Sequence, residues 1–443
     1  MLRRFRRGDL RLPVSGSAAG RARCEGTARP PYYGWVLVAT LGITTIISSG
    51  TSYYLFGVLV VPLGRDPGWG RGAVSGAYAL GVVLAGLLGV PIGRLVDRRG
   101  ARLPMVAGSA VGGLSLLGLS GVHALWQFYL LWAGGLGLAS ALTFYPVSFT
   151  VVANWFDRRR GAALALLTLL GGLASPIFVP LAGALVPRLG WRETVTALGL
   201  VQLGVALPLH ALVVRRHPED LGLRPDGLAA EGSPHPMHLS GLGVRAALRL
   251  RAFWTLTLAY ALATLAASVL LVHAVAYLIG RGYGGATAAA FAGAVGLASL
   301  PGRLGLNLLS DRVGPQPLLA LCLAAQAAGV ILLLQAASAC WLVAYVVVYG
   351  AAFGAISPLR AAVMADHVGR GAYGAITALQ GVPIAVVAGA GPLGAGWLYD
   401  RLGGYALAFW LAAGAFVLAS LCVAATPSRP EAAWHHPPTP RDT

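Results

Sequence analysis

The sequence of 443 residues has few charged side chains, and it contains no lysine. Charged residues make up 11% of the chain, whereas they make up about 25% of an average soluble domain. All 33 basic residues are arginine, as expected for a GC-rich genome, and only 15 residues are acidic. This shortage of charge excludes an ordinary soluble domain.

The residues needed for enzyme or cofactor chemistry are also scarce. A phosphate-binding motif of the form G-x-x-x-x-G-K-[ST] requires a lysine, so ATP-driven pumping is unsupported. No paired carboxylates, metal-ligand cluster or nucleophile with a base falls within an apolar segment. The cysteines lack the spacing of a disulfide or metal framework; they are Cys24, Cys322, Cys340 and Cys422. We therefore expect no enzyme activity, no cofactor and no metal.

The chain is instead rich in long apolar segments. Hydrophobic residues make up 57% of it, and the mean hydropathy is +0.71. Runs of about 18 or more apolar residues are long enough to span a bilayer as helices, and these runs show no strand alternation. The sequence predicts an all-α membrane protein with twelve transmembrane helices. They are expected at 34–62, 72–96, 103–121, 124–152, 160–186, 194–214, 252–279, 287–310, 316–336, 340–364, 373–399 and 404–426.

The arginines are unevenly distributed around these predicted helices. With the N-terminus placed in the cytoplasm, most arginines fall in cytoplasmic segments, and Arg303 and Arg360 fall within helices. The external loops contain only Arg65, Arg71, Arg188, Arg192, Arg281 and Arg401. This asymmetry follows the positive-inside rule and predicts two cytoplasmic termini in a multi-pass protein of the cell (inner) membrane. The net charge of +18 thus reflects topology, and we expect a lipid bilayer rather than nucleic acid as the partner.

The longest polar interruption divides the predicted helices into six and six. It covers residues 215–251 and is predicted to be a cytoplasmic linker between bundles at 32–214 and 252–426. The Arg-rich residues 1–31 lack the apolar core of a signal peptide. These residues and the Pro-rich residues 427–443 are expected to be disordered cytoplasmic tails. We expect a monomer.

The two halves share a short motif. The second predicted helix ends in Gly93-Arg-Leu-Val-Asp97-Arg98-Arg99-Gly100, and the eighth ends in Asn307-Leu-Leu-Ser-Asp311-Arg312-Val-Gly314. The Asp, the next Arg and the Gly superpose at an offset of 214, as in a duplicated chain. The glycines can take positive φ in a tight turn, and each Asp can meet an arginine or a helix N-terminus. We predict a conformational latch at the cytoplasmic mouth, formed by Gly93, Asp97, Arg98, Gly100, Asp311, Arg312 and Gly314.

The duplicated motif and the six-plus-six layout resemble the major facilitator superfamily along nearly the whole chain. This resemblance implies two six-helix bundles around a central cavity that opens alternately to each side. Four further motifs follow in chain order: Tyr32-Tyr33-Gly34-Trp35, Asn154-Trp155-Phe156-Asp157-Arg158-Arg159-Arg160-Gly161, Gly190-Trp191-Arg192 and Pro218-Glu219-Asp220-Leu221-Gly222-Leu223. In this order they resemble bacterial relatives of the monocarboxylate transporters and oxalate:formate antiporters.

The resemblance implies that an arginine of the eighth helix binds the substrate carboxylate, and Arg303 matches its place. Other positions depart from the family pattern. Proton-coupled monocarboxylate carriers have an Asp one turn earlier, where this chain has Ser299, and a first-helix Lys, for which the nearest match is Gly57. Oxalate carriers have an eleventh-helix Lys, and residues 373–399 contain none. A carboxylate proton carrier is therefore missing.

The residues themselves also point to Arg303. An arginine about two turns inside an apolar helix costs at least about 2.5–3.5 kcal/mol on insertion scales. Ser299, Arg303 and Asn307 are four residues apart and share one helix face. The guanidinium can donate two parallel hydrogen bonds to a carboxylate. We predict that this stripe faces the cavity and binds an organic anion. The alternative hypothesis is a structural arginine bonded to backbone carbonyls or a neighbouring helix.

Other polar residues of the predicted helices are weaker candidates. Tyr53 and Tyr54 can donate hydroxyls to an anion or anchor the helix at the interface. Arg360 can act as a second carboxylate clamp or extend to the membrane surface. His273 titrates in a useful range if transport is proton-linked; anion exchange and uniport are the alternatives. Candidates for pore-lining groups are Gln380, Thr377, Tyr145 and Ser175, each of which can equally hold helices together.

Small residues suggest how the predicted helices pack and bend. A stripe of small residues, four apart, runs along 72–96 and permits close packing or sliding; it comprises Ala77, Gly81, Ala85, Gly89 and Gly93. Bends are predicted at Gly171-Gly172 and Pro176, and around 389–392.

Three hypotheses for function follow. The leading one is a secondary or facilitative carrier of a small, monocarboxylate-like organic anion, bound by Arg303. A second is an exporter of an amphipathic neutral compound, in which Arg303 is structural. A third is a membrane sensor that binds a ligand without moving it, although 215–251 and both tails are too short and polar for a signalling domain.

Overall fold

The computed structural model describes residues 32–66, 68–227, 242–369 and 373–427, except for the side chains of Asn307 and Asp311. The expected tail at 1–31, nearly all of the expected tail at 427–443 and part of the predicted linker lie outside the described residues. Within the described residues, 12 helical stretches are long and apolar enough to cross a membrane. The predicted number of spans is confirmed, and their ends differ from the predicted ends by a few residues.

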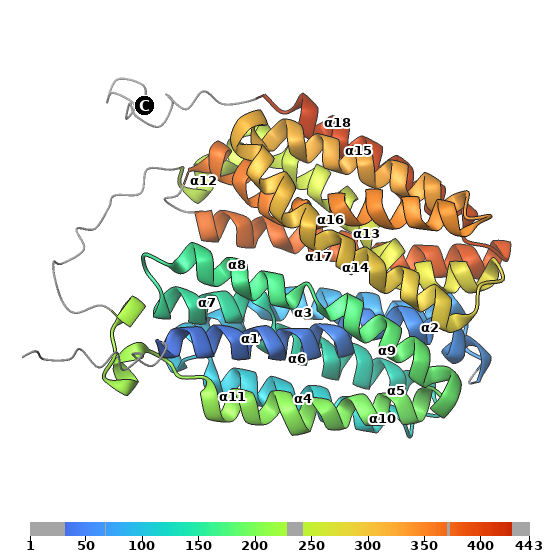
Figure 1. Ribbon diagram of the computed structural model, residues 1–443, viewed down its shortest axis with the longest axis horizontal. Helices are drawn as coiled ribbons and strands as arrows, with labels where there is room; N and C mark the ends of the chain where they lie inside the picture. The colour runs from blue at the N-terminus through green and yellow to red at the C-terminus, as the bar shows by residue number, and fades with distance from the viewer. Residues whose placement is uncertain (1–31, 67, 228–241, 370–372, 428–443) are drawn as a thin grey trace, which may run out of the picture. The chain divides into compact units, whose positions relative to one another are not determined.

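The first six spans lie together as one bundle (Figure 1). They are formed in chain order by α1 (Tyr33–Ser49), η1 (Gly50–Tyr54) and α2 (Leu55–Arg65); α3 (Arg71–Arg99); α4 (Arg102–Leu119); α5 (Leu125–Tyr129), η2 (Leu130–Leu136), α6 (Gly137–Thr143) and α7 (Tyr145–Trp155); α8 (Arg160–Gly171) and α9 (Ala174–Leu189); and α10 (Trp191–Val201), η3 (Gln202–Ala206) and α11 (Leu207–Val213).

The last six spans form the second bundle, and each is a single helix. They are α13 (Arg251–Gly280), α14 (Gly285–Val313), α15 (Pro315–Leu334), α16 (Ala339–Val368), α17 (Tyr373–Leu402) and α18 (Ala406–Ala425). The described part of the linker contains the short elements η4 (Pro218–Leu221), η5 (Pro225–Gly227) and α12 (Val244–Arg249).

Two spans of the first bundle break where the sequence disfavours a regular helix. α8 ends at Gly171 and Pro176 falls in the first turn of α9, so the predicted break at Gly171-Gly172 is confirmed. α6 and α7 are separated by Phe144, whose ψ is −176°. Pro146 then occupies the first turn of α7, where its missing N–H is not needed. α17 continues as one helix through 389–392, and the bend predicted there stays a prediction.

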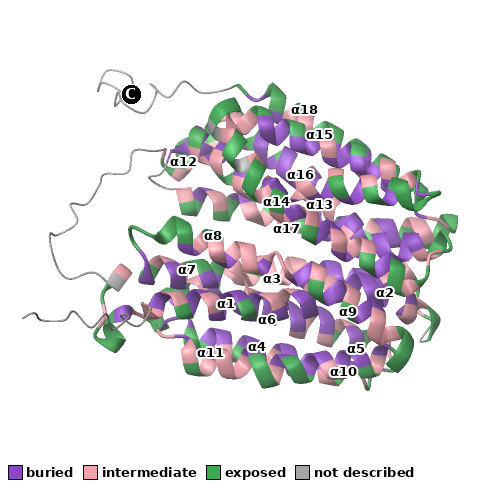
Figure 2. Ribbon diagram, in the orientation of Figure 1, coloured by how far each residue is buried: buried purple, intermediate pink, exposed green. Residues whose placement is uncertain are grey.

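Burial follows the helix faces (Figure 2). Buried residues gather where helices meet, whereas many large apolar side chains on outward faces are exposed. Examples of these exposed side chains are Leu114, Trp126, Leu212, Leu308 and Leu421. In a soluble protein such a surface would be a liability, but lipid is as apolar as leucine and does not penalise it.

The bundles meet chiefly through α3 with α17 and α9 with α14. Small residues permit these contacts, since a Cβ added to Gly389 would lie 2.9 Å from the Ala79 carbonyl oxygen. The predicted stripe of small residues on α3 lies in two different environments. Gly81 packs against the backbone of Ala133 within its own bundle, which supports the close-packing interpretation for that part. Gly89 faces open space.

Because twelve spans cross the membrane, residues 33 and 425 lie on one side of it, which we call the termini side. On the opposite, far side, the backbone of Arg71 in α3 is hydrogen-bonded to Asp400 at the end of α17. Toward the termini side, a Cβ added to Gly89 or Gly93 of α3, or to Gly381 of α17, would have no neighbouring atom within 4 Å. The described structure is therefore closed on the far side and open between α3 and α17 on the termini side.

The linker is held against the first bundle. The Asp226 carboxylate accepts hydrogen bonds from the backbone N–H groups of Asp157 (3.0 Å) and Arg158 (2.6 Å), just before α8. The Tyr32 hydroxyl donates to the carbonyl oxygens of Trp155 (2.9 Å) and Arg224 (3.1 Å). Burial raises the pKa of Tyr32 to about 12, so this hydroxyl keeps its proton.

Candidate functional site

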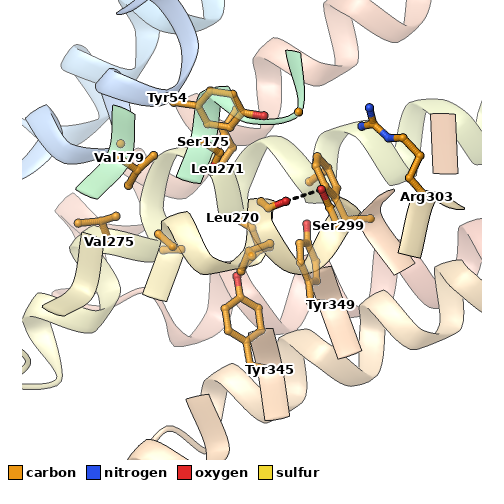
Figure 3. Close-up of a pocket in the computed structure, with 18 residues that line it drawn as sticks. Tyr54, Ser175, Val179, Leu270, Leu271, Val275, Ser299, Arg303, Tyr345 and Tyr349 are labelled. Atoms are coloured by element: carbon orange, nitrogen blue, oxygen red, sulfur yellow. Dashed lines mark hydrogen bonds between the residues drawn. The ribbon is translucent and has the colours of Figure 1, made fainter. Parts of the chain in front are cut away.

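A cavity of about 80 Å³ lies between the two bundles (Figure 3). The first bundle contributes Tyr54, Gly57, Gly172, Ser175 and Val179. The second contributes Ala267, Leu270, Leu271, Ala274, Val275, Ala292, Val295, Gly296, Ser299, Arg303, Tyr345, Tyr349 and Phe353. Arg303 is the only charged side chain among these lining residues. The site is therefore shared by both halves of the chain, and most of its lining comes from the second.

Arg303 stands at one end of the cavity, on α14. It is the cavity residue of α14 closest to the termini side, because α14 runs from the far side toward Val313. One guanidinium N–H donates to the carbonyl oxygen of Thr168 in α8, across the bundle boundary. The phenol groups of Tyr54 and Tyr145 lie near the guanidinium. Arg303 is thus both a cavity residue and a bridge between bundles.

Close packing of α16 on α14 fixes the backbone around Arg303. A Cβ added to Gly354 would overlap the Ser299 carbonyl oxygen and lie 3.0 Å from the backbone nitrogen of Arg303. A Cβ added to Gly302 would overlap the backbone of Ala351. Only glycine permits so close an approach of the two helices. This packing fixes the position of the Arg303 backbone, from which its side chain extends.

Ser299 lies one turn from Arg303 on the same face, as predicted, and both line the cavity. Its hydroxyl donates to the Gly296 carbonyl oxygen at 2.6 Å (Figure 3). Tyr54 and Ser175 line the cavity from the first bundle. The side chain of Asn307 lies outside the described residues.

An aromatic wall of the cavity was not anticipated from the sequence. Tyr345, Tyr349 and Phe353 follow one another at four-residue spacing on α16. The ring centroids of Tyr345 and Tyr349 are 5.5 Å apart, and Tyr349 stacks on Phe353 at 6.1 Å. The i, i+4, i+8 spacing was visible in the sequence, but it is equally typical of a lipid-facing or core helix face.

Several predicted site residues do not line this cavity. Tyr53 stacks on Phe144 at 4.7 Å and borders a smaller cavity inside the first bundle. The Gln380 amide donates to the Thr257 hydroxyl at 3.1 Å within the second bundle. The Arg360 guanidinium lies 4.5 Å above the Tyr260 ring centroid, in a cation–π contact.

His273 is fully buried but lies away from the cavity lining. Its Nε2 is 2.9 Å from the carbonyl oxygen of Pro392, and its Nδ1 is 3.1 Å from the Tyr405 hydroxyl. Thr377 donates to the carbonyl oxygen of Tyr373 at 2.9 Å in its own helix. The contacts of His273 place it between α13 and α17 on the far side.

The turn glycines of the predicted latch adopt the predicted conformation. Gly100 has φ of 81° and Gly314 has φ of 90°. Asp97, Arg98 and Arg312 are exposed, and the Asp97 side chain makes no hydrogen bond or ion pair with any residue that the structure describes. The side chain of Asp311 lies outside the described residues. Engagement of the latch stays a prediction for another conformation.

The geometry suits binding better than covalent chemistry. Among the described residues, no group of three or more His, Cys, Asp or Glu side chains is arranged to hold a metal ion. The cavity offers one cation, a few hydroxyls and a mainly apolar wall, which is the usual composition of a small-molecule site. Arg303 provides the positive charge of the site, and the aromatic wall provides an apolar surface.

Comparisons with known proteins agree with this architecture. The family model described as the Major Facilitator Superfamily matches residues 41–339 and 292–442. Monocarboxylate transporter 13 of Bos taurus is 30% identical over 429 residues, covering 91% of this chain and 94% of that protein. Monocarboxylate transporter 3 of Rattus norvegicus is 28% identical over 407 residues, covering 89% of this chain and 80% of that protein.

Solved structures show the same fold. A bacterial homolog of the human lysosomal transporter Spinster, in an inward-facing and unoccupied conformation, has a TM-score of 0.68 at 14% identity. That match covers 90% of this chain and 96% of the other. A mutant of the nucleoside transporter NupG has a TM-score of 0.69 at 12% identity, covering 89% of this chain and 99% of the other. At these identities the likeness concerns the fold alone.

Proposed function

We propose that this chain, which belongs to the major facilitator superfamily of membrane transporters, carries a small organic anion of the monocarboxylate type. Members of this superfamily move small molecules and are not enzymes. Alternating access of a central cavity between two bundles supplies the mechanism. The chain's resemblance to monocarboxylate transporters along nine-tenths of its length supports the substrate class.

The observation that carries the proposal is the Arg303 guanidinium at the end of a largely apolar cavity. A guanidinium has five N–H donors in a planar fork that matches the geometry of a carboxylate, and the Arg303 fork also bridges to the Thr168 carbonyl oxygen. An anion that reaches the guanidinium gains charge-assisted hydrogen bonds in a site with little competing water. A neutral solute would gain less from the same contact.

The size of the cavity favours a small substrate. Pockets for drug-sized ligands measure about 300–1,000 Å³, whereas this cavity measures about 80 Å³ in the described conformation. Tyr54 lines the same cavity and can donate its hydroxyl to the same carboxylate, as can Ser299 once its hydroxyl leaves the Gly296 carbonyl oxygen. The aromatic wall of Tyr345, Tyr349 and Phe353 can cover an apolar substituent.

Topology and location form part of the proposal. The arginine asymmetry supports cytoplasmic termini in the cell (inner) membrane, with bundles at 32–214 and 252–426 joined by 215–251. The open termini side would then face the cytoplasm. We propose that the chain works as a monomer, since the cavity is complete within one chain. Arg360 and Gln380 lie in the second bundle outside the cavity lining and are proposed to support its walls.

Uptake by purified protein in liposomes tests the role of Arg303. A panel of labelled short-chain monocarboxylates is offered to wild type, to Arg303→Gln and to Arg245→Gln, a control at an exposed arginine of α12. Removing hydrogen bonds to a charged group costs about 1.5–3 kcal/mol, so Arg303→Gln should weaken transport roughly 10- to 150-fold. Arg245→Gln should transport normally.

A second candidate function rests on the bond from Arg303 to the Thr168 carbonyl oxygen. That contact is what a purely structural arginine would make, and the cavity wall is mainly apolar. The chain would then export an amphipathic neutral compound. Undiminished carboxylate uptake by Arg303→Gln, with normal insertion and folding, would contradict the anion proposal and favour this exporter.

A further inference from the structure

The far-side contact between α3 and α17 repeats the turn motif in a third place. α17 ends in Gly396-Trp-Leu-Tyr-Asp400-Arg401-Leu-Gly403, which matches Gly93-Arg-Leu-Val-Asp97-Arg98-Arg99-Gly100 at the end of α3. The glycine that closes the turn again has positive φ, 72° at Gly403. α3 and α17 each end in this motif, but on opposite sides of the membrane.

The Asp400 carboxylate caps a helix of the other bundle. Its Oδ1 accepts the backbone N–H of Arg71 at 2.9 Å, and its Oδ2 accepts that of Gly72 at 2.8 Å. The first N–H groups of a helix have no partner within the helix, and α3 has no side-chain cap of its own at Gly70. The N-terminus of α3 is therefore capped from the opposite bundle, where a carboxylate also complements the helix dipole.

The side chain of Arg71 extends the same contact. Its Nη1 donates to the Tyr405 hydroxyl at 2.8 Å, and its guanidinium lies 3.6 Å above the Tyr399 ring centroid. A Cβ added to Gly396 would lie 2.7 Å from the Arg71 carbonyl oxygen. Close backbone approach, helix capping and a cation–π contact thus meet at one point between the bundles.

The chain of hydrogen bonds continues inward to His273. The Tyr405 hydroxyl lies 3.1 Å from Nδ1, and the Pro392 carbonyl oxygen lies 2.9 Å from Nε2. A carbonyl can only accept, so Nε2 carries the proton. Burial raises the pKa of Tyr405, so its hydroxyl keeps its proton and donates to Nδ1. When His273 is neutral, the Tyr405 hydroxyl and the Nε2 proton therefore each have an acceptor.

We propose that Asp400, Arg71, Tyr405 and neutral His273 form a far-side lock that holds the bundles in the described conformation and must open when the cavity turns to the far side. The internal repeat offers a comparison. When the glycines that close the turns after α9 and α17, Gly190 and Gly403, are aligned, Asp400 corresponds to Pro187 near the end of α9. Proline has no carboxylate, and the α9–α14 contact there relies on close packing of Gly183 against Ala289. The lock therefore belongs to the α3–α17 contact.

Protonation of His273 would oppose the lock. A second N–H at Nδ1 would point at the Tyr405 oxygen, which already accepts from Arg71, and the Tyr405 proton would lose its acceptor. The groups that face His273 are Arg71 and Ser75 from α3, the Pro392 carbonyl and Asp400 from α17, and Tyr405. This step rests on the proposed transport function and extends it, because it makes protonation of His273 the event that opens the far-side lock.

Distance measurement between spin labels tests the lock without transport. One label is placed on the native Cys340, exposed on the far side of the second bundle, and the other on Glu193→Cys in α10 of the first. The other cysteines are replaced, and double electron–electron resonance is recorded in lipid. Asp400→Asn should raise the ratio of the long-distance to the short-distance population roughly 2- to 30-fold, the effect expected for losing a helix cap.

Asp66→Asn is the matched control. Asp66 also lies on the far side, but its partners Trp191 and Arg192 belong to its own bundle. The label distances of this variant should equal those of wild type. A distribution for Asp400→Asn identical to wild type would overturn the lock, and so would an equal shift in Asp66→Asn. Tyr405→Phe, which removes the shared hydroxyl, should shift the distribution in the same direction as Asp400→Asn.

Recording the same distances at pH 8 and pH 5 tests the histidine step. Wild type should show more of the long distance at pH 5, and His273→Gln should show no difference between the two values. An equal pH response in both proteins, or none in wild type, would overturn this step. Because the readout is conformational, failure of the lock is distinguishable from failure of Arg303 to bind a carboxylate.

Discussion

Two carboxylates at the far side differ in what they hold together. Asp400 joins the bundles through backbone N–H groups of α3, whereas Asp66 joins α2 to α10 within the first bundle. Asp66 accepts from the Trp191 indole at 2.9 Å and is paired with Arg192. At the scale of single residues, an aspartate bonded to the other bundle thus holds the conformation of the transporter. An aspartate bonded within its own bundle stabilises only that bundle.

The charge of Asp66 gives a prediction about pH. Hydrogen bonds from Trp191 and then from Arg192 hold the pKa of this carboxyl below its ordinary 3.8. A lowered folded-state pKa means that the stabilisation is present above 3.8 and is lost as pH falls through the folded-state value. Asp66→Asn should therefore lower thermal stability slightly and equally from pH 5 to pH 8.

Thermal unfolding of the purified protein at several pH values checks this. Below pH 3.8 the difference between wild type and Asp66→Asn should shrink, because wild type also loses the charge. The effect should remain small because the pair is partly exposed. A difference that grows as pH falls would contradict the assignment.

Residue chemistry explains which site residues could be predicted from the sequence. Arg303 and Ser299 reach the cavity because polar groups on an apolar helix are costly anywhere else. Tyr53 and Tyr54 looked equivalent, but neighbours on a helix point in different directions, and only Tyr54 lines the cavity. Tyr349 gave no signal, since an aromatic residue suits a cavity, a core and a lipid face alike.

At the scale of helices, glycine decides how closely α14 and α16 approach. Gly302, Gly350 and Gly354 each face the backbone of the neighbouring helix. A Cβ added to Gly350 would lie 2.7 Å from the Val295 carbonyl oxygen. These helices carry both Arg303 and the aromatic wall, so their separation sets the width of the cavity.

Gly354→Ala should widen this contact. The new Cβ would overlap the Ser299 carbonyl oxygen, so α16 must move away, at a cost of about 1–3 kcal/mol. Thermal unfolding in detergent should show a clear loss of stability. Gly394→Ala in α17 is the control, because its Cβ would meet nothing within 4 Å and alanine favours helix by up to about 1 kcal/mol. Equal thermal stability of the two variants would contradict the prediction, because it would show that α14 and α16 can separate without a loss of stability.

The spans themselves were predictable because lipid imposes one rule on all of them: a helix of sufficient length with an apolar surface. The break after Gly171 was also predictable, since two glycines and a nearby proline weaken the helix there. The continuous course of α17 through Pro392 agrees with the predicted span at 373–399. Packing against α3 and α13 holds α17 in place, and such tertiary contacts are not written in the local sequence.

At the scale of the whole molecule, the sequence does not say which side of the cavity is closed. A transporter sequence must encode both states, and contacts of both are present in one chain. The termini-side latch residue Asp97 is exposed here, while Asp400 of the related motif is engaged on the far side. In the described conformation the far-side motif at Asp400 is the one in use.

Accessibility of single cysteines tests the sidedness and the open face together. Cys340 is exposed on the far side, and a side chain at position 89 would point into open space on the termini side. If the termini are cytoplasmic, an impermeant maleimide should label Cys340 in intact cells. It should label Gly89→Cys, in a background without other cysteines, only after the membrane is permeabilised. Ala79→Cys, which would be buried beneath Gly389, should label slowly under both conditions.

The labelling pattern at the three positions distinguishes a reversed membrane topology from an open far side. Labelling of Gly89→Cys, but not Cys340, in intact cells would place the termini outside and reverse the arginine argument. Correct sidedness combined with fast labelling of Ala79→Cys would leave the topology intact but show that the far side is open. Because α3 carries both engineered positions, their relative labelling rates report how the bundles separate along one helix. A tenfold difference in rate corresponds to about 1.4 kcal/mol in the free energy of exposing the thiol.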